Sequence, residues 1–333
     1  MQYFHSVFEL FSGVVLVFFS ALAFVNAIEF IGYRLKLGKS FVGAIVSPLF
    51  TSLPELTVFT VALLSNVRGG TEIGLGTIFG QPFMASSLSY GLVGLAVLFG
   101  YKSGKRTSYR LKVDRSLLIP YTFVTVLFPL TLIPGFIRGR AVRLFFGMIF
   151  VLSFIAYMVI MYLKRRSGII EDFEELYLSK IFSCEKITFL GLLQLGIATG
   201  ILYYGSKKLI SAVSNLSTIT GISPLGIALV LVPFATAIPE TISALIWGYR
   251  GKDTMSLGSL VGEKILYSTF YPGIGLFFTG WKIDDHAVFS VVTTTVVSLI
   301  LLYFISKDEV PWQALFSGII FFFAYTIFIF ILH

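Results

Sequence analysis

Two stretches of the sequence place a glutamate directly behind paired prolines, inside long apolar segments. Residues 47–55 read Ser-Pro-Leu-Phe-Thr-Ser-Leu-Pro-Glu, and residues 232–240 read Val-Pro-Phe-Ala-Thr-Ala-Ile-Pro-Glu. Proline, threonine, a branched aliphatic residue, proline and glutamate coincide in the two copies. A carboxylate at membrane depth costs roughly 2.5–3.5 kcal/mol on insertion scales, so its default interpretation is functional. Two matched copies therefore predict that Glu55 and Glu240 form part of one functional site.

The prolines indicate what chemistry these glutamates would do. Proline lacks a backbone N–H and clashes with the carbonyl one turn earlier, so each stretch should interrupt its helix. Carbonyls freed in this way are tolerated only inside protein or beside a water-filled cavity. The carbonyls of Thr51 and Thr236, together with Glu55 and Glu240, would supply the oxygen ligands that Ca²⁺ and similar hard cations require. The alternative is that the prolines only kink the helices and each glutamate caps a freed amide.

A second pair of related stretches follows each glutamate. Residues 76–80 (Gly-Thr-Ile-Phe-Gly) correspond to residues 258–262 (Gly-Ser-Leu-Val-Gly), and glycines four apart let helices pack closely. The second copy continues with Glu263 and Lys264, whereas the first continues with neutral residues. Neighbouring positions on a helix differ by about 100°, so these two charges cannot both face one site. Glu263 and Tyr267 are four residues apart and share a helix face.

The composition defines the environment of these residues. The chain has 333 residues, of which 56% are hydrophobic and 13% charged, and its mean hydropathy is +0.90. Soluble domains carry about 25% charged residues, so the lipid bilayer is the predicted environment. The net charge of +8 resides in short loops between apolar runs, which does not indicate nucleic acid as a partner. The sequence leaves the oligomeric state open.

Ten apolar runs are long enough to cross the roughly 30 Å of bilayer hydrocarbon. They span residues 8–31, 40–64, 72–99, 116–135, 142–163, 187–211, 222–248, 255–279, 286–305 and 310–332. Most basic residues lie in the odd-numbered loops between these runs. The positive-inside rule therefore predicts a multi-pass protein of the cell membrane with both termini outside.

The position of the proline stretches predicts an internal symmetry. They fall in the second and seventh runs, which are second in each set of five. Because five is odd, the second set must cross the membrane in the opposite direction, as in the inverted repeats of secondary transporters. The expected fold is all-α, with ten transmembrane helices in two inverted five-helix repeats whose second and seventh helices are broken. We expect repeats at residues 1–163 and 187–333, joined by a cytoplasmic loop at residues 164–186.

On these residues the sequence resembles the cation/calcium exchanger superfamily, which includes the sodium/calcium exchangers. Each half of a member carries Gly-Thr-Ser-Leu-Pro-Glu in its second helix. The topology matches over essentially the whole chain, and the motifs match over residues 41–86 and 226–268. The resemblance implies antiport by alternating access and a central divalent-cation site made by Glu55, Glu240 and the carbonyls of Thr51 and Thr236. It also implies that both termini lie outside.

The flanking motifs of that family are altered in this chain. Ser52 is kept, but the ligand positions of the third helix include Gln81, and those of the eighth helix are Glu263 and Tyr267. Lys264 replaces an asparagine of the motif. The oxygen ligands that would hold Na⁺ are therefore largely lost, and these five residues form a second tier of candidates for the ion pathway.

Charge arithmetic favours a divalent cation with protons as counter-ion. Glu55, Glu240 and Glu263 give −3, and Lys264 gives +1, so an ionised site carries −2. One divalent cation or two protons would neutralise this charge. We therefore expect Ca²⁺ exchange against H⁺ rather than Na⁺, with Glu263 titrating and Lys264 as a built-in positive charge. Alternatively, Lys264 pairs with Glu263 or Glu55 only to stabilise the fold.

Several other classes compete with an antiporter. The chain could retain the exchanger fold and bind or sense cations without transport, or it could carry a different cation. An ion channel is disfavoured, because inverted repeats with broken helices are typical of alternating access. The sequence has no His-Glu-x-x-His, Gly-x-Ser-x-Gly or P-loop motif, so neither an enzyme nor a cofactor is predicted.

Overall fold

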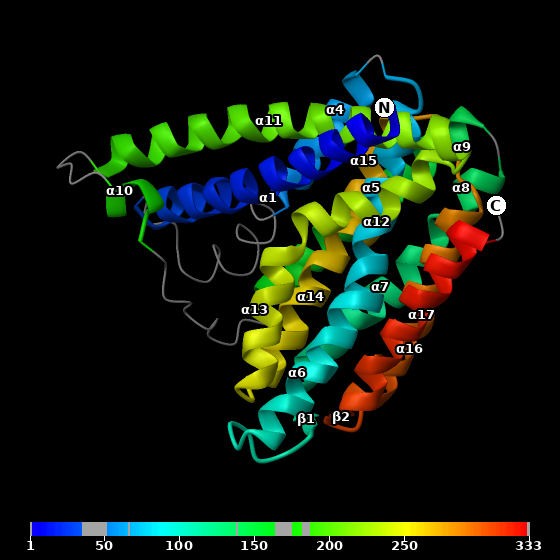
Figure 1. Ribbon diagram of the computed structural model, residues 1–333. Helices are drawn as coiled ribbons and strands as arrows, with labels where there is room; N and C mark the ends of the chain where they lie inside the picture. The colour runs from blue at the N-terminus through cyan, green and yellow to red at the C-terminus, as the bar shows by residue number, and fades with distance from the viewer. Residues whose placement is uncertain are drawn as a thin grey trace.

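The apolar runs form helices that lie side by side over most of the chain (Figure 1). The computed structural model describes residues 2–34, 52–65, 67–137, 139–163, 175–181 and 187–331. Its helices are α1 (Gln2–Arg34), α4 (Leu53–Leu64), α5 (Gly70–Met84), α6 (Tyr90–Lys102), α7 (Leu118–Leu130), α8 (Ile133–Phe136), α9 (Arg140–Leu163), α10 (Tyr177–Ile181), α11 (Ile187–Thr220), α12 (Pro224–Thr236), α13 (Ile238–Tyr249), α14 (Asp253–Ser268), α15 (Phe270–Phe278), α16 (Asp285–Ile305) and α17 (Trp312–Ile331). A π-helical segment (Ala85–Ser89) joins α5 to α6, and a 3₁₀ turn (Arg115–Leu117) precedes α7.

Within the described ranges, seven helices are long and apolar enough to cross a membrane, and an eighth span is formed if α12 and α13 count as one. The chain is therefore a multi-pass membrane protein. The predicted count of ten is not reached in these ranges. The second run begins outside them, since residues 35–51 are not described, and most of the predicted connecting loop at 164–186 also lies outside.

The predicted interruption of the seventh run is confirmed. Helix α12 ends at Thr236, α13 begins at Ile238, and the two are bent by 62°. Pro239 lies in the first turn of α13, where its missing N–H leaves no helical bond unmade. In the second run, α4 likewise begins just before a proline, Pro54.

The eighth run differs from the prediction of one uninterrupted helix over 255–279. Helix α14 ends at Ser268, and Thr269 has non-helical backbone angles (φ −136°, ψ −79°) before α15 begins. Pro272 explains the break, because its ring clashes with the carbonyl four residues earlier and its nitrogen cannot donate to it.

At one end of the molecule, loops far apart in sequence form a small sheet, which the all-α prediction did not include. Strand β1 (Arg110–Lys112) pairs antiparallel with β2 (Glu309–Pro311), and Leu111 lies opposite Val310. These two loops follow the third and ninth runs. Their pairing places them at the same end of the helices, as an alternating path through a membrane requires.

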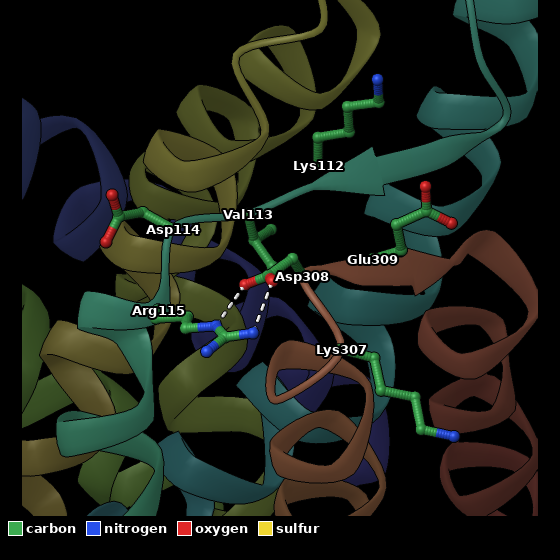
Figure 2. Close-up of a pocket in the computed structure, with 7 residues that line it drawn as sticks. All are labelled: Lys112, Val113, Asp114, Arg115, Lys307, Asp308 and Glu309. Carbon is green, nitrogen blue, oxygen red and sulfur yellow. Dashed lines mark hydrogen bonds and ion pairs between the residues drawn. The ribbon is translucent and has the colours of Figure 1, made fainter.

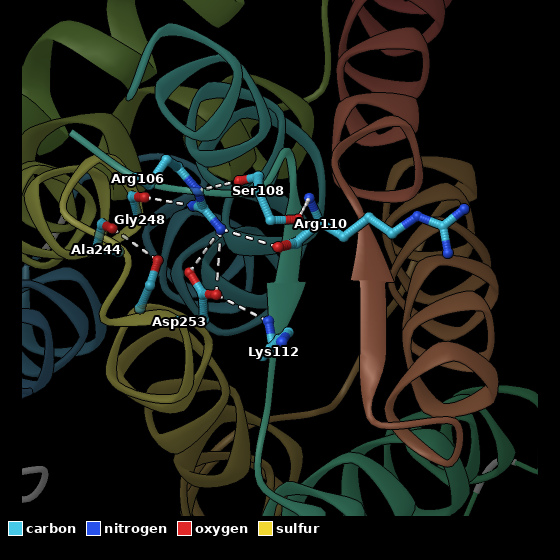
Figure 3. Close-up of polar contacts among 8 residues, drawn as sticks. Arg106, Ser108, Arg110, Lys112, Ala244, Gly248 and Asp253 are labelled. Atoms are coloured by element: carbon cyan, nitrogen blue, oxygen red, sulfur yellow. Dashed lines mark hydrogen bonds and ion pairs between the residues drawn. The ribbon is translucent and has the colours of Figure 1, made fainter. Parts of the chain in front are cut away.

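A buried ion pair fastens a third loop to this end (Figure 3). The guanidinium of Arg106 lies 3.1 Å from the carboxylate of Asp253 at the start of α14, and both side chains are almost fully buried. The same guanidinium donates hydrogen bonds to three backbone carbonyls, those of Ser108, Arg110 and Gly248. The loop after α6 is thereby tied to the turn between α13 and α14.

A surface pocket at this end carries charges of both signs (Figure 2). Arg115 donates two hydrogen bonds of 2.8 Å to the carboxylate of Asp308, but both side chains are at least half exposed. Lys112, Lys307 and Glu309 line the same surface. Exposed pairs of this kind contribute little to stability, so we regard this surface as a solvated loop region.

The loops at the opposite end are also joined to one another. The indole N–H of Trp281, before α16, donates to the carbonyl of Thr131 after α7 at 2.8 Å. The hydroxyl of Ser223, before α12, is hydrogen-bonded to Asp284. These contacts hold the end of the fourth run, the start of the seventh run and the turn between the eighth and ninth runs at one end of the molecule.

Helices α1 and α11 lie side by side and cross the other helices at a steep angle (Figure 1). Two buried amides on this pair hold the short helix α10. Asn26 of α1 accepts a hydrogen bond from the backbone N–H of Tyr177 (3.0 Å), and Gln194 of α11 accepts one from Leu178 (2.9 Å). Gln194 also donates to Asn26 at 2.9 Å. The amides thus satisfy N–H groups that the start of a helix leaves unpaired.

The glycine pair at 76–80 packs α5 against α12. A Cβ atom on Gly76 would lie 2.7 Å from Ala228 Cβ, and one on Gly80 would lie 2.4 Å from the carbonyl oxygen of Leu229. Gly258 and Gly262 have no such contact with the residues described here. Close packing therefore explains the first glycine pair but not the second.

Candidate cation site

The two glutamates of the proline stretches occupy equivalent local positions. Glu55 lies in the first turn of α4 and Glu240 in the first turn of α13, each following a proline at the start of its helix. The N-terminal end of a helix carries a partial positive charge that stabilises carboxylates. The Glu55 side chain is 1% exposed and Glu240 is half-buried.

Gln81 joins Glu55 to Glu263. From α5, its side-chain nitrogen Nε2 donates to Glu55 Oε1 at 3.0 Å and to Glu263 Oε1 at 2.8 Å. All three side chains are buried. The structure thus brings together carboxylates from α4 and α14, which belong to the two different halves of the chain.

The remaining members of the central set lie around this bridge. Glu240 is close enough for its charge to act on Glu263. Thr236, the last residue of α12, is buried, and its hydroxyl donates to the carbonyl of Val232 at 3.1 Å. Thr51 lies outside the described residues, so its predicted carbonyl ligand stays a prediction.

Ser52 and two tyrosines form one side of the site. Ser52, the residue before α4, is buried, and the hydroxyl of Tyr271 lies 2.7 Å from its carbonyl oxygen and 2.8 Å from its hydroxyl oxygen, so the one tyrosine proton can be donated to either. The ring of Tyr267 stacks on Tyr271 with centroids 4.5 Å apart, and its buried hydroxyl has no hydrogen-bond partner among the described residues. The sequence predicted Tyr267 but missed Tyr271. The four-residue spacing of the two tyrosines was the signal that could have found it.

Lys264 points away from the carboxylates. Its ammonium nitrogen donates to the hydroxyl of Ser298 on α16 at 2.9 Å and lies over the rings of Tyr90 and Tyr121, 5.1 and 5.8 Å from their centroids. It has no ion pair with a carboxylate in the described ranges. The alternative of a salt bridge to Glu263 or Glu55 is therefore wrong. The reason is the 100° step along α14, which turns this side chain towards α6, α7 and α16.

The site offers oxygen atoms for a cation. Glu55 Oε2 and Gln81 Oε1 are buried and accept no hydrogen bond of ordinary geometry from the described residues. In those residues no three His, Cys, Asp or Glu side chains converge closely enough to hold a metal ion by themselves. A cation here would therefore need amide, hydroxyl or backbone oxygens besides the carboxylates, as Ca²⁺ commonly has.

A π-helical segment that sequence reasoning did not anticipate lies one turn beyond Gln81. It spans Ala85–Ser89 and follows Pro82, which removes a backbone donor inside α5. Ser89 is hydrogen-bonded to Thr241, the neighbour of Glu240, at 2.8 Å between hydroxyl oxygens. Such segments are frequent at functional sites, and this one links α5 and α6 to α13 beside a candidate ligand.

Interrupted membrane helices that meet at buried carboxylates define a secondary transporter rather than an enzyme. Comparison with known proteins agrees. The family described as sodium/calcium exchanger protein matches residues 5–163 and 190–333, and the chain belongs to this family. The predicted membership of the cation/calcium exchanger superfamily is confirmed.

Two relatives and two solved structures show how far the similarity extends. The putative antiporter CaxA of Alkalimonas amylolytica is 22% identical over 275 residues, which are 83% of this chain and 81% of CaxA. The inner membrane protein YrbG of Escherichia coli (strain K12) is 24% identical over 277 residues, 83% of this chain and 80% of YrbG. The crystal structure of the H⁺/Ca²⁺ exchanger CAX matches with a TM-score of 0.77 and 15% identity, covering 97% of this chain and 82% of CAX. The sodium-calcium exchanger NCX_Mj matches with a TM-score of 0.57 and 19% identity, covering 97% and 98%.

These matches fix the class of the protein. The fold is that of the exchangers, and the family consists of membrane-embedded antiporters that handle inorganic cations. The general function of the protein is thus cation antiport, and Ca²⁺ is a transported ion of the family.

Proposed function

We propose that this protein exchanges Ca²⁺, or a similar divalent cation, against protons by alternating access. The observation that carries the proposal is the position of Gln81, which holds carboxylates from both halves of the chain within hydrogen-bond distance of one nitrogen atom. A site shared between two halves is exposed to one side or the other as the halves move, which is what alternating access requires.

The donor set suits a hard divalent cation. Glu55 and Glu240, with the carbonyls of Thr51 and Thr236, would provide the primary oxygens, and no donor among the described residues reaches the buried atoms Glu55 Oε2 and Gln81 Oε1. Several oxygen ligands of mixed type at a flexible site are typical of Ca²⁺. Mg²⁺ needs a stricter octahedron and retains its water, so we expect it to compete poorly.

The choice of protons over sodium rests on two features of the site. Ser52, whose oxygens could otherwise bind a monovalent ion, has both of them within 2.8 Å of the hydroxyl of Tyr271. Glu263 adds a third carboxylate that shares Gln81 with Glu55 and can take up a proton when the divalent cation leaves. In the proposed cycle, protons replace the divalent cation on the same carboxylates, so the two ions cannot be bound together.

The proposed arrangement in the membrane follows the sequence. Residues 1–163 and 187–333 form the two inverted halves, residues 164–186 connect them in the cytoplasm, and both termini lie outside. Loop contacts that separate into two groups at opposite ends of the helices support this arrangement.

A flux assay in proteoliposomes tests the proposal. We expect an imposed proton gradient to drive ⁴⁵Ca²⁺ uptake without sodium, and Glu55→Gln to abolish it. The matched control is Glu309→Gln, which makes the same change on an exposed strand residue and should leave uptake intact. A strict sodium requirement at constant pH would contradict proton coupling. Saturable ⁴⁵Ca²⁺ binding without counterflow would instead identify a cation sensor with the exchanger fold, and uptake of another cation in place of Ca²⁺ would identify a different substrate.

A further inference from the structure

The ammonium group of Lys264 is buried beside the carboxylate site, yet it contacts none of the carboxylates. Its side chain is 1% exposed. Its partners are the hydroxyl of Ser298 and the faces of Tyr90 and Tyr121, whose own hydroxyls are hydrogen-bonded to each other at 2.6 Å. We refer to Ser298, Tyr90 and Tyr121 as the lysine cage.

A buried lysine with only a structural role would be expected to contact a carboxylate. Burying an ammonium group is costly unless an opposite charge and hydrogen bonds compensate, and buried lysines are therefore usually paired with carboxylates. The cage supplies one hydroxyl oxygen and two aromatic faces, which attract cations but do not neutralise them. The nearest carboxylate along the chain, Glu263, lies on a different face of α14 and is bound to Gln81. No direct contact neutralises the positive charge of Lys264, so this charge acts through space on all the carboxylates of the site.

The cage resembles a binding place for a small monovalent cation. Aromatic faces and hydroxyl oxygens recognise ammonium and alkali ions. Thr294 lies one helical turn before Ser298, and its buried hydroxyl has no hydrogen-bond partner in the part of the chain that the structure describes. A second oxygen is therefore close by on the same face of α16.

We propose that Lys264 is a tethered co-ion: its ammonium occupies the place of a monovalent cation beside the carboxylate site and makes the exchanger independent of such ions. The proposal deepens the proposed function and rests on it. The three site glutamates carry −3, and with the lysine they carry −2, which one divalent cation balances. Without the lysine, one divalent cation would leave −1, and a free monovalent cation would be needed to complete the balance.

Two variants that remove the charge differ in the space they leave. Lys264→Ala opens room beside the two tyrosine rings, whereas Lys264→Met fills it with a neutral chain of similar length. We expect both variants to lose Ca²⁺ flux, on the order of tenfold if the charge lies about 10 Å from the carboxylates at the effective dielectric of protein interiors. Methylammonium, K⁺ or Na⁺ should restore the flux of Lys264→Ala, and ethanol, which is neutral, should not. Lys264→Met should gain little from any of them, because the space is filled.

The control for these variants is Lys307→Met. Lys307 also lies over a tyrosine ring, with its nitrogen 4.2 Å from the centroid of Tyr303, but it is exposed in a loop. This variant and the wild-type protein should show the same ⁴⁵Ca²⁺ flux with and without monovalent ions. A general effect of salt or alkylammonium on the vesicles would appear in them as well.

A further variant silences the charge while keeping the lysine. Ser298→Asp places a carboxylate next to the ammonium, so the pair is neutral. The Ca²⁺ flux of this variant should therefore match that of Lys264→Met. Because it keeps the lysine, it can be measured even where the lysine variants give little folded protein. The proposal is overturned if Lys264→Met and Ser298→Asp both retain wild-type flux without monovalent ions, or if no monovalent cation restores a defective but folded Lys264→Ala protein. Wild-type protein that moves no divalent cation would refute the proposed function instead. In that case ⁴⁵Ca²⁺ binding to the same variants decides the role of Lys264, because the tethered charge should make binding independent of monovalent ions.

Discussion

Replacing Gln81 by leucine separates two contributions to the stability of the carboxylate site, that of the Gln81 hydrogen bonds and that of a bound cation. The side chain of Gln81 donates one hydrogen bond to each of two buried carboxylates, at 3.0 and 2.8 Å. Hydrogen bonds to charged groups contribute about 1.5–3 kcal/mol each, so the cation-free protein should lose roughly 3–6 kcal/mol of stability. Both acceptor oxygens lie near one nitrogen atom and are therefore at most about 6 Å apart. At that distance, two unit charges repel by about 3 kcal/mol at an effective dielectric constant of 20, and leucine cannot offset this repulsion.

A bound divalent cation would compensate much of this loss. Because it lies between the carboxylates and attracts both, Ca²⁺ should raise the melting temperature of Gln81→Leu by more than it raises that of the wild-type protein. The measurement is thermal unfolding of the purified protein in detergent, with and without Ca²⁺, together with ⁴⁵Ca²⁺ flux in proteoliposomes. Gln313→Leu makes the same change on an exposed position of α17 and should alter neither quantity.

Two outcomes would contradict a cation site between Glu55 and Glu263. If Gln81→Leu melts at the wild-type temperature without Ca²⁺ and shows the same Ca²⁺-induced shift, the amide does not bridge two charged groups. If its melting temperature falls equally with and without Ca²⁺, the residue matters for packing but the cation does not bind between these carboxylates.

Three further predictions concern the framework around the site. Arg106→Met should destabilise the protein by about 3–5 kcal/mol because it leaves a buried carboxylate unpaired, whereas Arg115→Met, in an exposed pair, should leave the melting temperature nearly unchanged. Gly80→Ala should lower both stability and flux, since its Cβ would meet backbone at 2.4 Å, whereas Gly262→Ala should be tolerated; thermal unfolding and flux compare the two. Asn26→Leu should release α10, detected as faster proteolysis of the connecting segment, while retention of wild-type protease resistance would show that other contacts hold it.

The sequence predicted the parts of the site that depend on local physics. Proline lacks the backbone donor and favours the first turn of a helix, so the break before Glu240 could be placed to within a residue or two, although Pro233 of the same stretch lies inside α12. A carboxylate in an apolar run must find polar neighbours inside the protein, so Glu55 and Glu263 could each be expected to face the interior. Neither inference needed knowledge of how the helices pack.

The parts that could not be predicted depend on which helix lies on each side of α14. The 100° step along a helix separates Glu263 from Lys264, but it does not say that Gln81 faces one and Ser298 the other. That choice is made by the packing of α5 and α16 against α14, which no local pattern encodes. The break at Thr269 was missed because the run is apolar throughout, although Pro272 was a usable signal.

The two halves differ at the site, with the neutral Gln81 in the first and the charged Glu263 and Lys264 in the second, and this difference has a physical consequence. Gln81 on α5 is neutral, and both of its hydrogen bonds are donated to carboxylates, so it holds Glu55 and Glu263 together without reducing their charge. A lysine in its place would cancel part of the charge that a cation must find, and a third carboxylate there would add repulsion. A neutral donor is therefore the residue type that keeps two carboxylates close and still available to a cation. Because Gln81 on α5 is neutral, the fixed positive charge near the carboxylates comes from Lys264 on α14. In our proposal this charge acts on the carboxylates at a distance rather than by direct contact.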